Sequence, residues 1–205
     1  MSITAEQILA AVKSRTNRTA ETSASIENEV CDALQFISRA EAFIMNEDTS
    51  QGLAASAYTL DEPDDFGCIG EGGGVFVYLD GEVDVPALPK MDFTFPAEYS
   101  EGRPQAYELF NDNGTDKIRV WPAADEAYLV LIRYGKIHPY STASILLPDR
   151  CRQALYWKAS EFVARVNRQI ELAEYCETQY IKEMNVIRSK LPSKPRTTSP
   201  HGWVF

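Results

Sequence analysis

The chain has 205 residues, with 30 Asp or Glu against 20 Lys or Arg and a formal net charge of −10. A protein that binds nucleic acid draws most of its affinity from clusters of Lys and Arg, and this sequence has none, so a nucleic-acid-binding role is disfavoured. An acidic surface past which DNA slides without binding is compatible with the charge. No apolar run reaches the roughly 20 residues of a membrane span, and the first residues lack a signal-peptide pattern, so we expect a protein that folds in the cytoplasm.

Two amphipathic helices are predicted near the N-terminus. Thr4 and Gln7 have the spacing of a capping box, and the first helix is expected to continue to about Lys13. A polar stretch over 14–25 predicts a loop. Apolar residues at helical spacing then predict a second helix over 26–43.

The middle of the chain predicts a β block. Short strands are expected at 57–60 and 75–79, and the second is followed by the turn signal Asp80-Gly81 and a returning strand at 82–85. Three more strands are expected at 105–110, 117–122 and 127–134. Because short turns join these three, they predict an antiparallel meander.

The longest amphipathic pattern runs over 147–190, where apolar residues recur every three or four positions. Pro148 and Asp149 suit the first turn of a helix. The backbone N–H groups of this turn have no partner within the helix, so proline loses no hydrogen bond there. The Asp149 carboxylate lies near the positive end of the helix dipole. A straight helix of this length would measure about 65 Å, too long for a compact domain. We therefore expect a turn near Asn167-Arg168-Gln169 and two antiparallel helices.

These elements predict an α+β fold. The simplest packing is a four-helix bundle made from the N- and C-terminal helix pairs, with the antiparallel β block as an insert. The expected units are the N-terminal helices over 1–50, the β sub-domain over 51–140, the C-terminal hairpin over 141–191 and an extended tail over 192–205.

Two loops resemble ligand sites only weakly. Four carboxylates lie between Asp61 and Asp65, but they lack the spacing of a calcium loop, so a solvated acidic loop is the better interpretation. The glycine-rich stretch 70–74 has no Gly-Lys-Ser/Thr and no following helix, which favours a turned loop over a phosphate cradle.

No catalytic, cofactor-binding or metal-binding set is predicted, and we expect no enzyme. His138 and His201 fall in no recognisable catalytic arrangement. The four cysteines are far apart, and three of them lie at helical apolar positions, where they are expected to act as small buried hydrophobes: Cys31, Cys151 and Cys176. Three aromatic residues of the predicted sheet are interpreted as core or subunit-interface residues rather than a base-stacking platform: Trp121, Tyr128 and Tyr134.

The tail over 192–205 is rich in proline and basic on an acidic protein, and it closes with large apolar residues. The plain interpretation is a disordered end. The alternative is a docking arm, in which Lys194 and Arg196 steer the segment to an acidic partner while Trp203, Val204 and Phe205 anchor it.

Several short motifs, in this order, resemble one known family. They are LQFISR at 34–39, AYTL at 57–60 with DDF at 64–66, GRPQAY at 102–107, IRVWPAAD at 118–125, YLVLIRY at 128–134 and LLP at 146–148. The chain resembles the head-to-tail adaptor, or connector, proteins of tailed bacteriophages over residues 3–190. It departs from them at 166–169, where VNRQ stands in place of an LGD-like turn.

The resemblance implies a structural protein of the virion neck that is assembled in the host cytoplasm. It implies a dodecameric ring docked on the portal protein, which retains packaged DNA, lets it pass through the lumen and presents a surface to a tail or stopper protein. Neither sequence-specific nucleic-acid binding nor membrane association is expected. The alternatives are a tail-completion or stopper protein of the neck and, further away, a small cytosolic enzyme or ligand-binding domain.

Overall fold

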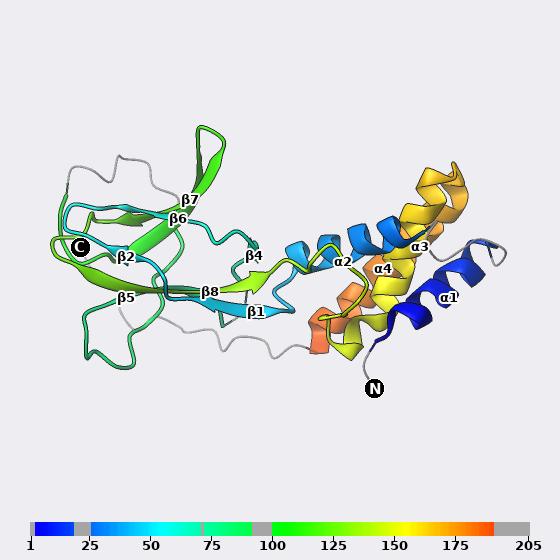
Figure 1. Ribbon diagram of the computed structural model, residues 1–205, viewed down its shortest axis with the longest axis horizontal. Helices are drawn as coiled ribbons and strands as arrows, with labels where there is room; N and C mark the ends of the chain where they lie inside the picture. Colours follow the sequence, from blue (N-terminus) through cyan, green and yellow to red (C-terminus); the bar gives the residue numbers. More distant parts are fainter. Residues whose placement is uncertain (1–2, 19–25, 71, 92–99, 191–205) are drawn as a thin grey trace, which may run out of the picture.

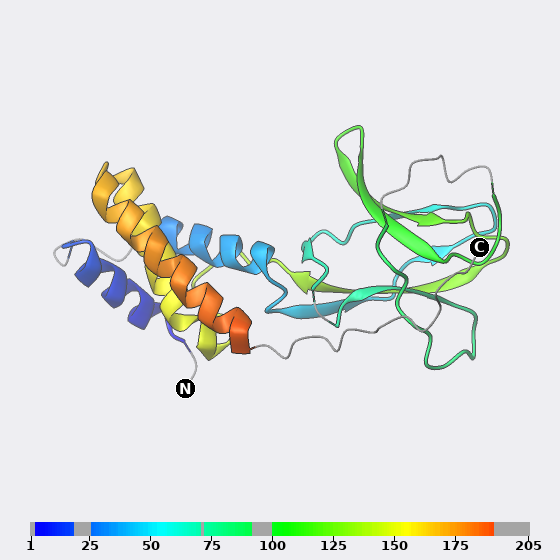
Figure 2. The same ribbon diagram turned by 180° about the vertical axis from the view of Figure 1, so that it is seen from behind.

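The computed structural model describes residues 3–18, 26–70, 72–91 and 100–190. The molecule is elongated, with the α-helices at one end and the β-strands at the other (Figure 1). The helices from the N-terminal and C-terminal parts of the chain lie side by side although the strands separate them in sequence, and the opposite view agrees (Figure 2). The α+β class is therefore confirmed.

The N-terminal helices are α1 (Ala5–Arg15) and α2 (Glu27–Ala40). The predicted capping box is confirmed, because the Gln7 backbone N–H donates to Thr4 Oγ1 at 3.3 Å and the Gln7 side chain accepts from the Thr4 backbone N–H. The helix α2 ends three residues before the predicted limit of 43. Part of the predicted loop over 14–25 lies outside the described residues.

The predicted C-terminal hairpin is confirmed. A single 3₁₀ turn, η3 (Asp149–Cys151), follows Pro148 and leads into α3 (Arg152–Val166), and α4 (Ile170–Lys190) follows after a three-residue turn. Arg168 takes a positive φ of 58°, which reverses the chain. The Asn167 side chain donates to the Val163 carbonyl at 2.7 Å, and the Asn167 backbone N–H donates to the same oxygen at 3.2 Å, so both bonds close the end of α3.

The four described helices share one hydrophobic core, and α3 contacts each of the other three. Ile8, Leu34, Leu155 and Met184 come one from each helix and are at most 2 % exposed. Burying each such side chain stabilises the fold by about 1.5–3 kcal/mol. This shared core joins the two ends of the chain.

The first sheet is organised around β8 (Tyr128–Lys136), and all its pairings are antiparallel. β1 (Met45–Asp48) and β2 (Gly52–Leu53) pair along one edge of β8. β4 (Phe66–Cys68) and β5 (Gly74–Tyr78) pair along the other edge. Sequence patterns missed β1, β2 and β4, because they are short and their apolar residues do not alternate clearly.

The second sheet has the order β3-β7-β6, from β3 (Thr59–Asp61), β7 (Thr115–Trp121) and β6 (Ala106–Asp112). The β6–β7 hairpin is as predicted, but the three-stranded meander is wrong, because β8 belongs to the first sheet. Both edges of β7 are occupied, one by β3 and one by β6, so β7 has no edge left for β8.

The returning strand predicted at 82–85 is also wrong. The Glu82 backbone N–H donates to the Leu79 carbonyl at 3.1 Å and closes a turn, and Asp84 takes a positive φ of 58°. The Glu82 carboxylate accepts from the Leu79 backbone N–H and pairs with Arg103 at 2.7 Å. These contacts hold the segment as a loop, in which Val83 is 83 % exposed.

A second hydrophobic core is built from both sheets. Val75, Val77, Val130 and Ile132 of the first sheet are at most 1 % exposed, and the second sheet contributes Ile118, Val120 and Tyr107. The molecule therefore has one core under the helices and another under the strands.

Candidate functional site

The residues predicted to form a docking arm, Lys194, Arg196, Trp203, Val204 and Phe205, lie outside the described residues. The structure describes the base from which that segment continues. The helix α4 ends at Lys190, and the Arg188 guanidinium pairs with Glu41 at 2.6 Å. Since Glu41 directly follows α2, the end of α4 lies beside the C-terminal end of α2.

An open groove of about 660 Å³ lies along α2 and the end of α3. Six residues of α2 line one side and three of α3 the other: Glu29, Asp32, Gln35, Phe36, Arg39 and Ala40, then Phe162, Arg165 and Val166. Phe36 is 42 % exposed and Val166 is 65 % exposed. The groove therefore combines an apolar floor with charged rims, a composition suited to a polypeptide partner.

A buried ion pair lies next to the groove. Lys158 Nζ donates to the Glu161 carboxylate at 2.8 Å, and both side chains are at least 94 % buried. The same ammonium lies 4.0 Å from the centre of the Phe36 ring and 5.0 Å from the centres of the Phe162 and Tyr180 rings. The rings that line the groove therefore also help to hold a buried cation.

The pair extends towards solvent through Arg165. Its guanidinium contacts Glu161 at 2.8 Å and Glu177 of α4 at 2.9 Å. Hydrogen bonding to Glu161 raises the pKa of Arg165, so this residue stays charged. The network links α3 to α4 at the end of the groove.

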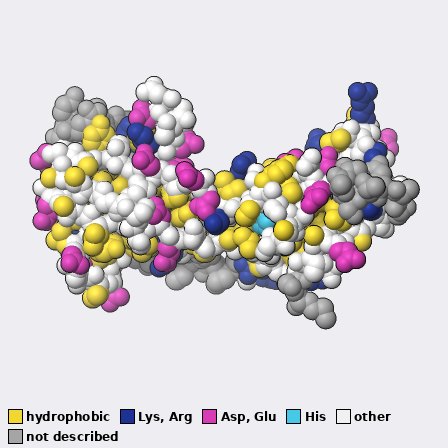
Figure 3. Space-filling model, in the orientation of Figure 1, with side chains coloured by type: hydrophobic (Ala, Val, Ile, Leu, Met, Phe, Trp, Pro, Cys, Tyr) yellow, Lys and Arg dark blue, Asp and Glu magenta, His cyan; other side chains and the backbone are white. Residues whose placement is uncertain are grey.

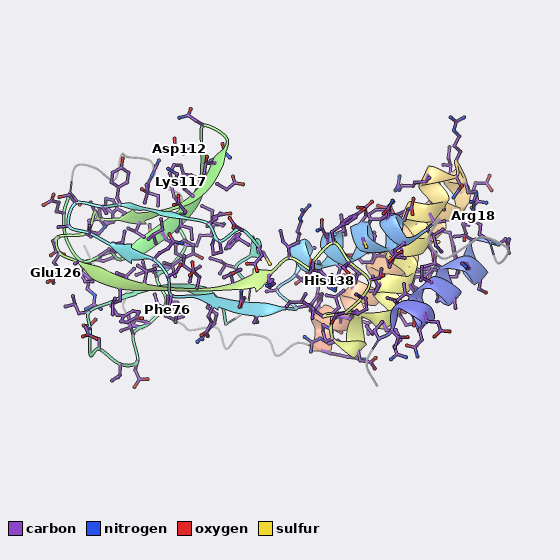
Figure 4. All side chains as sticks on the ribbon, viewed as in Figure 1. Arg18, Phe76, Asp112, Lys117, Glu126 and His138 are labelled. Carbon is purple, nitrogen blue, oxygen red and sulfur yellow. The ribbon has the colours of Figure 1, made fainter. Side chains whose placement is uncertain are left out.

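His138 connects the strands to the helices. It is fully buried in the linker after β8, at the junction between the two ends of the molecule (Figure 4). Its backbone N–H donates to Ser38 Oγ of α2 at 2.8 Å, and its Nε2 accepts from the Leu146 backbone N–H at 3.1 Å. Burial lowers the pKa of His138, which favours the neutral ring that the bond accepted by Nε2 requires.

A second polar network supports β8 from the sheet side. The Tyr134 hydroxyl donates to Asp65 and accepts from Asn46 at 2.9 Å, and Lys136 pairs with Asp65 at 2.6 Å. Burial and the bond to Asp65 raise the pKa of Tyr134 to about 12, so the hydroxyl keeps its proton. Asp65, predicted as part of a solvated loop, is therefore a structural partner of β8, whereas Asp61 and Asp64 are exposed.

The tip of the β6–β7 hairpin projects from the β end of the molecule (Figure 4). Asp112 and Lys117 pair across it at 3.2 Å. Further down, Arg119 pairs with Glu108 at 2.8 Å and lies 4.1 Å from the centre of the Phe110 ring. The hairpin is thus held by its own contacts and presents polar side chains.

The predicted aromatic residues separate into two environments. Tyr128 and Tyr134 are at most 5 % exposed and belong to the core of the sheets, as one of the two interpretations held. Trp121 is 39 % exposed at the end of β7. Of these three aromatic side chains, the Trp121 indole is the one exposed enough for a subunit contact.

The cysteines and the glycine-rich loop are the remaining candidates. Cys31, Cys151 and Cys176 are buried as predicted, and burial raises the pKa of the Cys151 thiol to about 12, which makes it unreactive. In the glycine-rich loop, Gly72 takes a positive φ of 78°, consistent with a turned loop. Within residues 3–18, 26–70, 72–91 and 100–190, no three His, Cys, Asp or Glu side chains gather as a metal site, and none of the helices is long and apolar enough to cross a membrane.

Comparison with protein families gives a match to the SU10 adaptor protein model over residues 3–201. This match spans both cores and nearly the whole chain. The chain belongs to the SU10 adaptor protein family. A comparison with curated proteins finds no match.

The SU10 adaptor family is a family of phage head-to-tail adaptors, so the resemblance predicted from the sequence motifs is confirmed. Such adaptors are structural components of the virion neck, which interact with portal and tail components. The groove on α2 and α3 was missed at the sequence level. A signal that could have indicated it is Phe36, a large apolar side chain on the polar face of α2.

Proposed function

We propose that this SU10 adaptor forms a ring between the portal and the tail, retains packaged DNA and lets it pass during ejection. The observation that carries the proposal is the family match over residues 3–201. The elongated shape supports it, because helices at one end and sheets at the other offer two separate surfaces (Figure 1). One surface suits the portal, and the other suits the tail or a stopper protein.

The helices would act as a four-helix bundle against the portal and the neighbouring subunits. In this proposal the units are the helices of 1–50 and 141–191, the β sub-domain of 51–140 and the tail of 192–205. The residues on the outside of α3 and α4 then become subunit contacts. Exposed apolar side chains on α4 support this assignment, namely Ile170, Tyr175, Ile181 and Val186.

The charge of the chain suits passage of DNA. Each subunit carries a formal charge of −10, and on the face shown in Figure 3 the Asp and Glu side chains are spread over both ends of the molecule. A ring of such subunits repels the phosphate backbone, so DNA passes through the lumen without binding. No sequence-specific nucleic-acid contact is needed for this role.

Docking on the portal would use the arm after α4. Lys194 and Arg196 would steer it to an acidic surface, and Trp203, Val204 and Phe205 would fill an apolar pocket of the portal. Aromatic anchors give most of the binding energy in such contacts, so their loss is expected to weaken binding strongly.

The test is a pull-down with the portal protein. Full-length adaptor is expected to bind, and a chain truncated after Leu191 is expected to bind much less. A matched variant with Trp203 and Phe205 both changed to Ser keeps the length and charge of the arm and isolates the anchors. Equal binding by all three proteins would refute the docking arm.

Ring formation is tested separately by electron microscopy of the adaptor mixed with portal. Rings that form only with the portal support the proposal. Location of the protein on the tail side of the neck, away from the portal, would instead identify a stopper or tail-completion protein.

A further inference from the structure

We propose that the groove on α2 and α3 holds residues 191–196 of the same chain, so that the arm leaves the helices along a defined path. The proposed function concerns the far end of the arm, at Trp203 and Phe205, and it does not require this contact. The inference therefore goes beyond the portal-docking proposal.

The groove offers the features that an extended segment requires. Its floor is apolar, at Phe36, Ala40 and Phe162, and it runs along three turns of α2. Towards the N-terminal end of α2, Asp32 is exposed and the Oε2 of Glu29 is buried with no hydrogen-bond partner among the described residues. A buried carboxylate oxygen without a donor is unfavourable, so this end of the groove favours a cationic side chain.

The position of α4 brings the segment to this groove. The Arg188–Glu41 ion pair places the end of α4 at the Ala40 end of the groove. Beyond Lys190 an extended chain covers at most about 3.5 Å per residue, which allows about 14 Å to residue 194 and about 21 Å to residue 196. Along α2, the path from Glu41 back to residue 32 measures about 14 Å, and back to residue 29 about 18 Å.

The sequence of the segment matches the groove in order. Leu191 and Pro192 come first and are apolar, as is the floor at Phe36 and Ala40. Lys194 and Arg196 follow, and a fully extended chain is long enough to bring them to the acidic end. The two arginines of the groove do not repel the basic residues of the segment. Arg165 is neutralised by Glu161 and Glu177. Arg39 lies at the Ala40 end of the groove, where the proposed path begins with uncharged residues.

This path divides the arm into two parts. The part over 191–196 is held on the helices, and the part over 197–205 extends beyond the groove. A held base reduces the conformational entropy that the anchors lose when they bind a partner, because fewer residues remain to be ordered.

The proposal is tested by hydrogen exchange of the full-length protein without portal. The backbone amides of Leu191, Ser193, Lys194 and Arg196 are expected to exchange more slowly than those of an unstructured chain. The change Asp32→Lys is expected to speed the exchange of Lys194 and Arg196 about fivefold, the effect of one exposed ion pair. The variant Glu174→Lys makes the same charge change on an exposed position of α4 outside the groove and is expected to have no effect.

A charge exchange gives the sharper readout. The change Lys194→Glu alone lies outside the helices, so it leaves the fold intact and is expected to speed exchange. Combined with Asp32→Lys, it is expected to restore the slow exchange. A purely structural effect of Asp32→Lys would not be restored in this way.

Three results would overturn the inference. The first is exchange of 191–196 in the wild-type protein at the rate of an unstructured chain. The second is protection that neither single charge change affects. The third is protection that is lost on dilution, because it would assign the groove to the arm of a second copy. None of these results bears on portal binding through Trp203 and Phe205, which the pull-down measures.

Discussion

Removal of one member of the buried Lys158–Glu161 pair is expected to destabilise the helices more than removal of both. In Glu161→Leu the ammonium of Lys158 stays buried and loses its carboxylate at 2.8 Å. In Lys158→Met the thioether replaces the ammonium against the same three aromatic rings, and Glu161 keeps its contact with Arg165. In the double variant no buried charge of the pair remains.

The magnitudes follow from burial. Breaking a buried pair on one side usually costs about 3–5 kcal/mol, because an uncompensated charge stays in the interior. For Glu161→Leu, the contacts of the Lys158 ammonium with the rings offset part of this, so we expect about 3 kcal/mol. For Lys158→Met we expect about 1–2 kcal/mol, since the sulfur packs well on aromatic rings and Glu161 remains paired. The double variant is expected within about 1 kcal/mol of the wild type, which makes the coupling at least about 3 kcal/mol.

Urea unfolding followed by circular dichroism at a helix-sensitive wavelength measures these changes. The four proteins form a double-mutant cycle, and equal slopes of the transitions would justify comparing their free energies of unfolding. Additive effects of the two changes would refute the reasoning, because they would mean that the two charges do not stabilise one another.

The other predictions concern the junction, the sheet and the first helix. The pKa of His138 is lowered from its ordinary 6.5, so as the pH falls the unfolded chain binds this proton before the folded protein does. The free energy of unfolding should therefore fall as the pH decreases below 6.5. A His138→Asn variant should show a flatter dependence of this free energy on pH in urea titrations. Tyr134→Phe removes the bonds to Asp65 and Asn46 and should lower stability by about 1–2 kcal/mol, measured as a lower melting temperature, and an unchanged value would contradict the role of this network. Thr4→Ala should lower stability by about 1 kcal/mol through loss of the capping box, whereas Thr4→Ser should retain it in the same melting assay.

Sequence patterns predicted the helices well because each helix is governed by local rules. Thr4 and Gln7 cap α1 as their spacing predicted, and the turn at 167–169 lies where the apolar period fails. The strands were harder, since their pairing depends on residues far apart in the chain. The third strand of the expected meander, β8, pairs instead with four short strands between residues 45 and 78.

The candidate surface was predictable only in part. The basic and apolar residues of the arm, from Lys194 to Phe205, stand out in the sequence because their composition differs from the acidic chain. The groove did not stand out, because its two sides come from helices that are more than a hundred residues apart. The sequence predicts no site at His138, because its buried contacts with Ser38 and Leu146 form only when the segment after β8 packs against α2.

The sequence by itself determined the class of the fold, the helix pairs and the family, because periodicity, capping and ordered motifs are properties of neighbouring residues. Tertiary structure alone decided which strand edges are occupied, where Lys158 finds its carboxylate and aromatic rings, and that Arg188 brings the end of α4 beside Glu41. These features depend on which surfaces meet when the two ends of the chain pack into one core, and burial strengthens such contacts only after that packing has excluded water.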